Sequence, residues 1–318
     1  MRTVRTLRVA VAGALGVLSL TACGAAETGK SNSAGGDKTV KLTVPSWVGA
    51  QANVAVAKQI LEKELGYKVK TQQMGEVLAW DALSKGDIDG ILEDWGHPKE
   101  EKQYVETKKT VVKGGDLGVT GHIGWFVPKY FADKHPDVTD WKNLNKYAKE
   151  FRTAESGDKG ELLEGSPDYV TNDDAIIKNL KLNLKTKYAG SEAAQITAIK
   201  KYAAAKKPFI TYWWTPQWLN AQIDMVEVKL PEYKEGCDAD PKKVACAYPH
   251  TPLQKFFNAD FAKEGGEAAE FLKNFKWTTE QQNEVALMIA GEKMSPEAAA
   301  EKWVKENEAT WKAWLPKK

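Results

Sequence analysis

The sequence predicts an α/β protein with two lobes. Strand and helix patterns alternate between residues 40 and 92, which is typical of a parallel sheet covered by helices on both faces. A long extended run dotted with glycines follows at residues 118–128 and is suited to connect two lobes. A second series of helix and strand patterns comes next. The chain of 318 residues is long enough for each lobe to bury its own core.

The first lobe begins with five alternating elements. We expect a strand at 40–44, a helix that ends before Gly66, a strand at 67–71, a helix at 76–83 and a strand at 88–92. The third strand leads directly into Trp95. Ligands of α/β proteins bind beyond the carboxyl ends of such strands, so Trp95 is a candidate binding residue.

In the second lobe, a helix is expected to begin at Asp173, with Thr171 or Asn172 as its cap. The free backbone N–H groups of a helix start are suited to bind a carboxylate, and the aromatic residue Tyr169 lies just upstream. The turn at Gly49 and Ala50 is a second candidate for the same role. The pattern alone is also that of an ordinary capped helix.

An amphipathic helix at 191–205 leads to an apolar strand and then to a cluster of tryptophans, Trp213, Trp214 and Trp218. Pro216 is typical of the first turn of a helix, so these rings are placed at a strand-to-helix junction. Tryptophan is also the best side chain for holding a cation against a ring face. The alternative is that each ring belongs to the core, where most Trp side chains are found.

The last part of the chain is predicted to be helical after a strand at 225–231 that crosses back. Thr278 and Gln281 form a capping-box pattern. A final helix is expected to begin at Pro296, with three tryptophans, Trp303, Trp311 and Trp314, at core positions. We therefore assign residues 40–120 and 231–318 to lobe 1 and residues 121–230 to lobe 2.

Residues 1–22 have the pattern of an export signal. Three Arg and no acid precede an apolar run that is too short to span a membrane, and Leu-Thr-Ala-Cys follows at 20–23. This motif resembles a bacterial lipobox and predicts a lipid on Cys23, which anchors the protein outside the cytoplasmic membrane. Residues 23–39 are small and polar, typical of a flexible linker.

Charge and cysteine usage exclude several functions. The three Arg of the signal leave 42 basic and 43 acidic residues, a net charge of −1 that gives no support for nucleic-acid binding. Cys237 and Cys246 close a short polar loop, and outside the cytoplasm such a pair predicts a disulfide. The four His are scattered, so neither a metal nor another cofactor is expected.

No catalytic pattern is found in the sequence. There is no GxSxG motif and no phosphate-binding glycine loop. The acidic neighbours Glu93 and Asp94 point to opposite faces of a strand and cannot act on one substrate atom. The sequence therefore predicts a binding protein and not an enzyme.

Several of these motifs together resemble the substrate-binding lipoproteins of glycine betaine/proline betaine ABC importers. The motifs are the lipobox, Gly-Asp-Ile-Asp at 86–89 followed by Trp95, Ser-Pro-Asp-Tyr at 166–169, Tyr-Trp-Trp-Thr-Pro-Gln-Trp at 212–218, Phe-Lys-Trp-Thr at 275–278 and Pro-Glu-Ala-Ala-Ala at 296–300. The resemblance implies a monomer with the type II periplasmic-binding-protein fold, two lobes and a crossing-strand hinge. Its partners would be a membrane permease and its ATPase.

The resemblance also implies an aromatic cage for a quaternary ammonium group. By motif, Trp95 and Trp214 match two cage positions, and Tyr169 most nearly matches the third. Trp47, Trp125 or Trp213 could provide the third wall instead. A trimethylammonium group cannot donate a hydrogen bond, so ring faces are the groups that can hold it. Rings from both lobes would make the ligand favour a closed state.

The sequence leaves other ligands open. Choline, carnitine, proline betaine and ectoine are rivals of glycine betaine within the same class. A carbohydrate-binding or carbohydrate-cleaving lipoprotein is the rival from another class, since Trp also stacks on sugar rings. Such a site needs polar and acidic side chains near the rings, and only Asn220 and Asp224 follow the Trp cluster.

Overall fold

The computed structural model describes residues 38–317, and these residues belong to one compact unit. The predicted signal peptide, the lipidation site Cys23 and most of the predicted linker lie outside the described residues. Within the described range, the structure contains no helix that is both long enough and apolar enough to cross a membrane.

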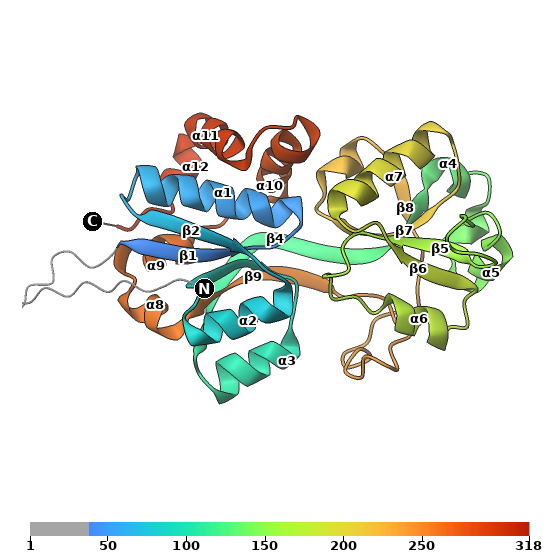
Figure 1. The fold of residues 1–318 in the computed structure, drawn as a ribbon, viewed down its shortest axis with the longest axis horizontal. Helices are drawn as coiled ribbons and strands as arrows, with labels where there is room; N and C mark the ends of the chain where they lie inside the picture. Colours follow the sequence, from blue (N-terminus) through green and yellow to red (C-terminus); the bar gives the residue numbers. More distant parts are fainter. Residues whose placement is uncertain (1–37, 318) are drawn as a thin grey trace, which may run out of the picture. The chain divides into compact units, whose positions relative to one another are not determined.

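One mixed sheet runs through the whole unit (Figure 1). Its strands are β1 (Thr39–Val44), β2 (Lys68–Gln73), β3 (Gly90–Asp94), β4 (Val111–Pro128), β5 (Gly160–Glu164), β6 (Leu184–Tyr188), β7 (Ile210–Thr215), β8 (Met225–Glu227) and β9 (His250–Asn258). The order is β2-β1-β3-β9-β4-β7-β5-β6, with β8 paired to β4. The parallel pairs of β1 with β2 and β3 confirm the predicted strand–helix alternation.

Helices cover both faces of this sheet in each lobe (Figure 1). The α-helices are α1 (Val48–Lys63), α2 (Glu76–Lys85), α3 (Pro98–Glu100), α4 (Lys129–Ala132), α5 (Leu144–Tyr147), α6 (Asp173–Asn179), α7 (Glu192–Ala204), α8 (Ala259–Glu264), α9 (Gly266–Asn274), α10 (Thr279–Ala286), α11 (Pro296–Glu306) and α12 (Glu308–Lys312). The 3₁₀ and π segments are η1 (Glu101–Thr107), η2 (Pro136–Thr139), η3 (Trp141–Asn143), η4 (Trp218–Ala221) and η5 (Leu287–Gly291).

Two lobes follow from the way the helices pack. In lobe 1, α1 and the C-terminal helices pack on one face of β1–β3, while α2 packs on the other face. In lobe 2, the strands β5, β6 and β7 carry a separate core with α4–α7. The predicted fold class, an α/β protein with two lobes joined by crossing strands, is confirmed.

The strands β4 and β9 connect the lobes side by side (Figure 1). The first part of β4 pairs with β9, and residues His122 to Phe126 pair with β7. We expected the strand at 225–231 to be the crossing strand, but the short β8 stays in lobe 2 and pairs with the end of β4. The second crossing strand is β9, which was not predicted from the sequence.

The loop before β9 belongs to lobe 2, although we assigned residues from 231 onward to lobe 1. Val244 and Tyr248 are buried in the lobe 2 core, and Asn179 of α6 donates hydrogen bonds to the carbonyls of Lys242 and Val244. The chain therefore returns to lobe 1 through β9. The assignment of residues 231–249 to lobe 1 does not agree with this packing.

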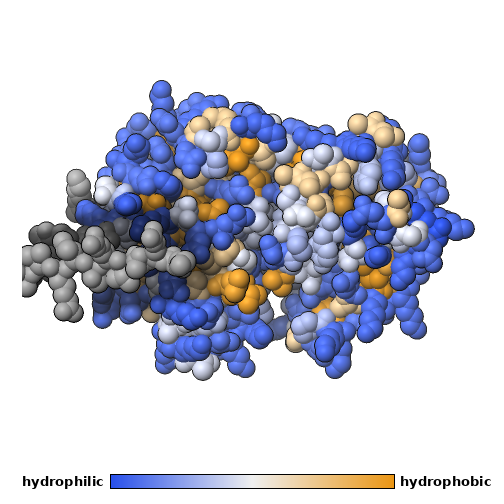
Figure 2. Space-filling model, in the orientation of Figure 1, coloured by the Kyte–Doolittle hydropathy of each residue, from blue (hydrophilic) through white to orange (hydrophobic). Residues whose placement is uncertain are grey.

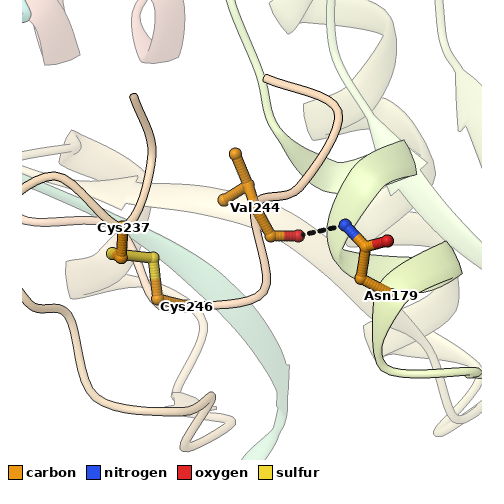
Figure 3. The surroundings of a disulfide bond; sticks show 4 residues. All are labelled: Asn179, Cys237, Val244 and Cys246. Carbon is orange, nitrogen blue, oxygen red and sulfur yellow. Dashed lines mark hydrogen bonds between the residues drawn. A yellow bond between two sulfur atoms is a disulfide. The ribbon is translucent and has the colours of Figure 1, made fainter. Parts of the chain in front are cut away.

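A disulfide joins Cys237 to Cys246 within this loop, as predicted (Figure 3). Figure 3 shows the side chain of Asn179 reaching from its helix to the carbonyl of Val244, two residues before the second cysteine. The crosslink closes the loop on itself, and this hydrogen bond connects the loop to α6 of lobe 2.

Local capping explains where several helices begin. Thr278 and Gln281 form the predicted capping box, and Ser295 caps α11 through the N–H of Ala298. Pro216, however, follows a cis peptide bond, and η4 begins only at Trp218, with Gln217 as its cap. The prediction that Pro216 lies in the first turn of a helix is therefore wrong.

The three C-terminal tryptophans are core residues, as expected. Trp303, Trp311 and Trp314 are buried in lobe 1, and the rings of Trp303 and Trp314 stack 6.0 Å apart. Asn307 separates α11 from α12, so these residues do not lie on one continuous helix. The molecular surface on the face shown in Figure 2 is mainly hydrophilic.

Candidate functional site

A cavity of about 140 Å³ lies where the two lobes meet. Aromatic rings make up much of its wall, and both lobes supply them: Trp47 and Trp95 from lobe 1, and Tyr169, Tyr212, Trp214 and Tyr248 from lobe 2. None of the residues that line it is Lys or Arg. The cavity is therefore lined largely by aromatic rings, and its other ionisable side chains are Glu76, His97 and Asp238.

Tyr169 lies among the other rings. Its ring centroid is 6.1 Å from that of Trp47, with an interplanar angle of 77°. It is 5.8 Å from that of Trp214, with an angle of 88°. The Trp47–Tyr169 contact joins the lobes, because Trp47 precedes α1 and Tyr169 lies in the loop before α6. Rings of different orientation from both lobes thus surround one space.

The alternation of β7 decides which of its rings face the cavity. Successive side chains of a strand point to opposite faces. Tyr212 and Trp214 line the cavity, while Trp213 points the other way, is fully buried and donates its indole N–H to Asn220 Oδ1 at 2.7 Å. The structure therefore places Trp213 in the core and not in the cage wall.

Glu93 fixes the two tryptophans of lobe 1. Trp47 Nε1 donates to Glu93 Oε1 at 2.6 Å, and Trp95 Nε1 donates to the same oxygen at 2.8 Å. The ring of Trp95 also packs against β4 at Gly121, where a Cβ atom would lie 2.4 Å from the ring. The carboxylate of Glu93 therefore fixes both indoles, and the lack of a side chain at Gly121 leaves room for the ring of Trp95.

His97 is a polar group directed to the cavity. Its Nδ1 lies 2.7 Å from Asp94 Oδ2, and its Nε2 is buried without a hydrogen-bond partner in residues 38–317. Burial lowers the pKa of His97, but the hydrogen bond and charge of Asp94 and the charge of Glu76 outweigh it and raise the pKa to about 9. His97 is thus a cationic donor whose Nε2–H is available to a ligand.

Glu76 and Tyr169 are the other polar groups near His97. Burial, more than any other cause, raises the pKa of Glu76 to about 7, although the charge of His97 lowers it. Glu76 Oε1 is 3.8 Å from His97 Nε2, and Glu76 Oε2 accepts the N–H of Val170 across the lobes at 3.4 Å. The hydroxyl of Tyr169 is buried and has no hydrogen-bond partner among the described residues.

The start of α6 is not arranged as we expected. Asn172 lines the cavity, but its backbone N–H donates to Tyr248 Oη at 2.8 Å, and Thr171 does not line the cavity. The same Tyr248 hydroxyl donates to Asp173 Oδ1 at 2.6 Å. The N–H of Asn172, which we expected to be free for a carboxylate, is therefore already bound to a protein group.

Three further candidates lie away from the cavity. Trp125 is fully buried, and its indole N–H donates to Asp173 Oδ1 at 2.8 Å, so it belongs to the lobe 2 core. Gly49 and Ala50 are in the first turn of α1 and do not line the cavity. Next to this turn, the backbone N–H of Val48 donates to the carboxylate of Glu192 in lobe 2.

Of the predicted site residues, the structure brings together Trp47, Trp95, Tyr169, Asn172 and Trp214. The cavity is also lined by residues that were not predicted from the sequence, namely Glu76, His97, Tyr212 and Tyr248. Tyr212 could have been found from its position two residues before Trp214 on the same strand face. No local pattern predicted Tyr248, because it reaches the cavity through the position of the crossing strand β9 that follows it.

The fold and the cavity define this chain as a two-lobed solute-binding protein. Residues 38–306 match the substrate-binding domain of the ABC-type glycine betaine transport system, and the chain belongs to that family. It is therefore the extracytoplasmic solute-binding component of an ABC importer.

The comparisons with known proteins cover most of the chain. The trimethylamine N-oxide-binding protein of Pelagibacter ubique is 27% identical over 300 residues, which cover 89% of this chain and 92% of that protein. Lactococcal OpuAC, solved closed around glycine betaine, superimposes with a TM-score of 0.70 at 24% identity over 88% of this chain and 100% of that one. An ABC-transporter choline-binding protein in complex with choline gives a TM-score of 0.70 at 19% identity, over 87% and 91%.

Proposed function

We propose that the interlobe cavity binds a small zwitterion with a trimethylammonium group, and that glycine betaine is the leading candidate. The main observation that supports this proposal is that aromatic rings from both lobes surround a cavity without Lys or Arg. These rings are Trp47, Trp95, Tyr169, Tyr212 and Trp214. A methylated ammonium group has no hydrogen to donate, so ring faces are its natural partners. Each desolvated contact contributes about 2 kcal/mol.

The carboxylate of the ligand would be bound by His97 and Tyr169. Both side chains line the cavity, and the His97 Nε2 and Tyr169 Oη atoms have no hydrogen-bond partner in the described part of the chain. A ligand carboxylate would accept from the imidazolium and the phenol, and so satisfy two buried donors. These side chains replace the helix start at Asn172, whose N–H is already used.

Because rings and donors come from both lobes, the ligand would bind the closed arrangement more tightly than an open one. Trp95 and His97 follow β3 in lobe 1, whereas Tyr169 and Trp214 belong to lobe 2. Closure with ligand inside is the signal that a membrane permease and its ATPase would respond to. Lipidation of Cys23 would hold the chain at the outer face of the cytoplasmic membrane.

Trimethylamine N-oxide is the second candidate. The relative from Pelagibacter ubique is named for it, and the burial that raises the pKa of Glu76 to about 7 gives the cavity a carboxyl group that can carry a proton. A protonated Glu76 would donate to the N-oxide oxygen, whereas an ionised Glu76 would repel a carboxylate. Choline is the third, since an ionised Glu76 would accept from its hydroxyl.

Titration calorimetry with a panel of ligands tests this proposal. The panel contains glycine betaine, trimethylamine N-oxide, choline, carnitine, ectoine and a set of neutral sugars. Glycine betaine is expected to bind with a dissociation constant in roughly the micromolar range, because the ring contacts with the ammonium group and the charge-assisted hydrogen bonds to the carboxylate act together. Binding of a sugar without binding of any methylated amine would overturn the proposal.

The lipid anchor has its own test. Metabolic labelling with a radioactive fatty acid in a bacterial host should mark the wild-type chain, and the Cys23→Ala variant should carry no label. A labelled Cys23→Ala variant would exclude this residue as the attachment site. The Cys246→Ala variant serves as the control, because its labelling should remain.

A further inference from the structure

The carboxylate of Glu93 lies outside the cavity, on the side of Trp47 and Trp95 where their indole nitrogens are. All the side-chain groups that hydrogen-bond to it are donors. Its Oε1 accepts the indole N–H groups of Trp47 and Trp95, at 2.6 and 2.8 Å. Its Oε2 accepts Gln282 Nε2 at 2.6 Å and also the side-chain amide of Asn53. Glu93 is 3% exposed and is not one of the cavity-lining residues, so it does not touch a ligand.

The four hydrogen-bond donors around Glu93 favour the ionised form of its carboxyl group. An ionised carboxylate has about four acceptor positions and no hydrogen to donate, which matches the four donors around Glu93. A protonated Glu93 would place its own O–H against one of these donors. Burial is the larger effect and raises the pKa of Glu93 above its ordinary value, and the hydrogen bonds from Trp47, Trp95, Gln282 and Asn53 oppose this rise. The surrounding side chains are thus built for the anion.

An anion bound to an indole N–H changes what the indole can do. Hydrogen-bonded groups polarise one another in a low-dielectric interior, so a carboxylate at the ring nitrogen pushes electron density toward the ring face. The attraction of a cation to that face is electrostatic and rises with this density. The negative charge of Glu93 also attracts the cation through the ring, because screening by water is weak in a buried site.

We propose that Glu93 is a positioning and specificity-determining residue that makes Trp47 and Trp95 selective for a cation over a neutral group of the same shape. This inference rests on the proposed function, because it assumes that the two indoles contact a methylated ammonium group. It goes further by assigning the charge preference of the cage to a residue outside the cavity. The shape of the cage selects three methyl groups, and Glu93 selects the positive charge.

The test compares two ligands of equal shape. Glycine betaine carries a nitrogen where tert-butylacetate carries a carbon, and only the first has a positive charge. Affinities of both are measured by calorimetry, directly or by competition, for the wild-type protein and for Glu93→Gln. We expect Glu93→Gln to bind glycine betaine about tenfold more weakly, which corresponds to about 1.4 kcal/mol, and tert-butylacetate within threefold of the wild type.

A matched control variant separates charge from packing. Gln282→Leu removes a donor from the other oxygen of the same carboxylate and leaves both indole hydrogen bonds and the charge in place. It should bind glycine betaine within threefold of the wild type. Equal losses in Glu93→Gln and Gln282→Leu, or equal losses for the two ligands, would overturn the inference.

A charge-swap variant covers the case in which Glu93→Gln does not fold. The double variant Glu93→Gln/Gln282→Glu keeps the net charge and the hydrogen-bonding groups of the cluster but moves the anion away from the indoles. It is expected to lose at least threefold in affinity for glycine betaine, and unchanged affinity would contradict the inference. If the wild-type protein binds no methylated amine, the proposed function itself is wrong. This result can be told apart from the outcomes that overturn only the role of Glu93, because those require binding by the wild type.

Discussion

Val48 and Glu192 connect the starts of two helices that belong to different lobes. The backbone N–H of Val48, at the start of α1, donates to Glu192 Oε2 in the first turn of α7 at 2.7 Å. The other oxygen of Glu192 accepts from Gln217 Nε2 at 2.8 Å. A carboxylate is favoured at a helix start by the unpaired N–H groups and the helix dipole, and Glu192 lies at two such starts. It therefore stabilises the arrangement in which the lobes touch.

Glu192→Ala is expected to weaken ligand binding without altering the cage. A hydrogen bond to a charged group contributes about 1.5–3 kcal/mol, and this one is lost when the lobes separate. The dissociation constant for glycine betaine should therefore rise about 10- to 100-fold. Calorimetry measures the affinity, and small-angle X-ray scattering of the liganded variant should show a more open particle. The control is Glu155→Ala, an exposed acid, for which an unchanged affinity is expected.

Trp214→Phe tests the role of the β7 ring. Trp214 is 5% exposed, and its ring centroid lies 4.7 Å from that of Trp213, so truncation to Ala would also damage the core. Phe retains part of this packing but is a weaker partner for a cation. We expect at least a tenfold loss of glycine betaine affinity by calorimetry. Trp311→Phe in the lobe 1 core should cost similar stability in urea unfolding and leave the affinity unchanged; a loss there too would assign the effect to folding.

His97→Gln should change ligand preference. If the His97 imidazolium binds the carboxylate, the variant loses about tenfold or more in affinity for glycine betaine but keeps its affinity for choline, which has no carboxylate. The pKa of His97 is raised to about 9, so wild-type affinity for glycine betaine should fall as the pH rises through about 9. Calorimetry at pH 7 and pH 10 measures both effects. Parallel losses for the two ligands would mean that His97 does not distinguish them.

The buried acids of the interface predict a stability that falls as pH rises. Burial raises the pKa of both Glu76 and Glu192 to about 7 in the folded protein, above their ordinary value of 4.5. Between these values both glutamates bind more protons in the folded state than in the unfolded state, so their contribution to the free energy of unfolding decreases from about pH 4.5 to about pH 7. Urea unfolding across this range measures the slope. The variant Glu76→Gln/Glu192→Gln should flatten it, and an unchanged slope would assign the dependence to other groups.

Reduction of the disulfide should loosen one wall of the cavity. The bond between Cys237 and Cys246 closes a short loop, for which chain entropy predicts about 2–3 kcal/mol of stabilisation. The same loop carries Asp238 and leads to Tyr248, both of which line the cavity. The variant Cys237→Ser/Cys246→Ser is expected to unfold at lower urea concentration and to bind glycine betaine more weakly. Asn179→Ala, which removes the hydrogen bond to Val244 but keeps the crosslink, should have a smaller effect on both.

The sequence determined the features that local chemistry encodes. Strand and helix alternation predicted the parallel pairs of β1, β2 and β3, because side-chain periodicity and glycine punctuation act within a few residues. The capping box at Thr278 and the disulfide between Cys237 and Cys246 were predictable for the same reason. Motif spacing selected Trp95 and Trp214, which the structure brings to one cavity.

Only the tertiary structure decided how these parts combine. The face on which Trp213 or Trp214 lies depends on the phase of β7 in the sheet, and a shift of one residue exchanges them. His97 and Tyr248 reach the cavity because β3 and β9 pair, although they are distant in the sequence. The sequence suggested that the backbone N–H of Asn172 would be free to bind the ligand. In the structure it donates to Tyr248, and no local pattern predicts this contact. Contacts between residues far apart in the chain leave no periodic signal, so they emerge only from the packed fold.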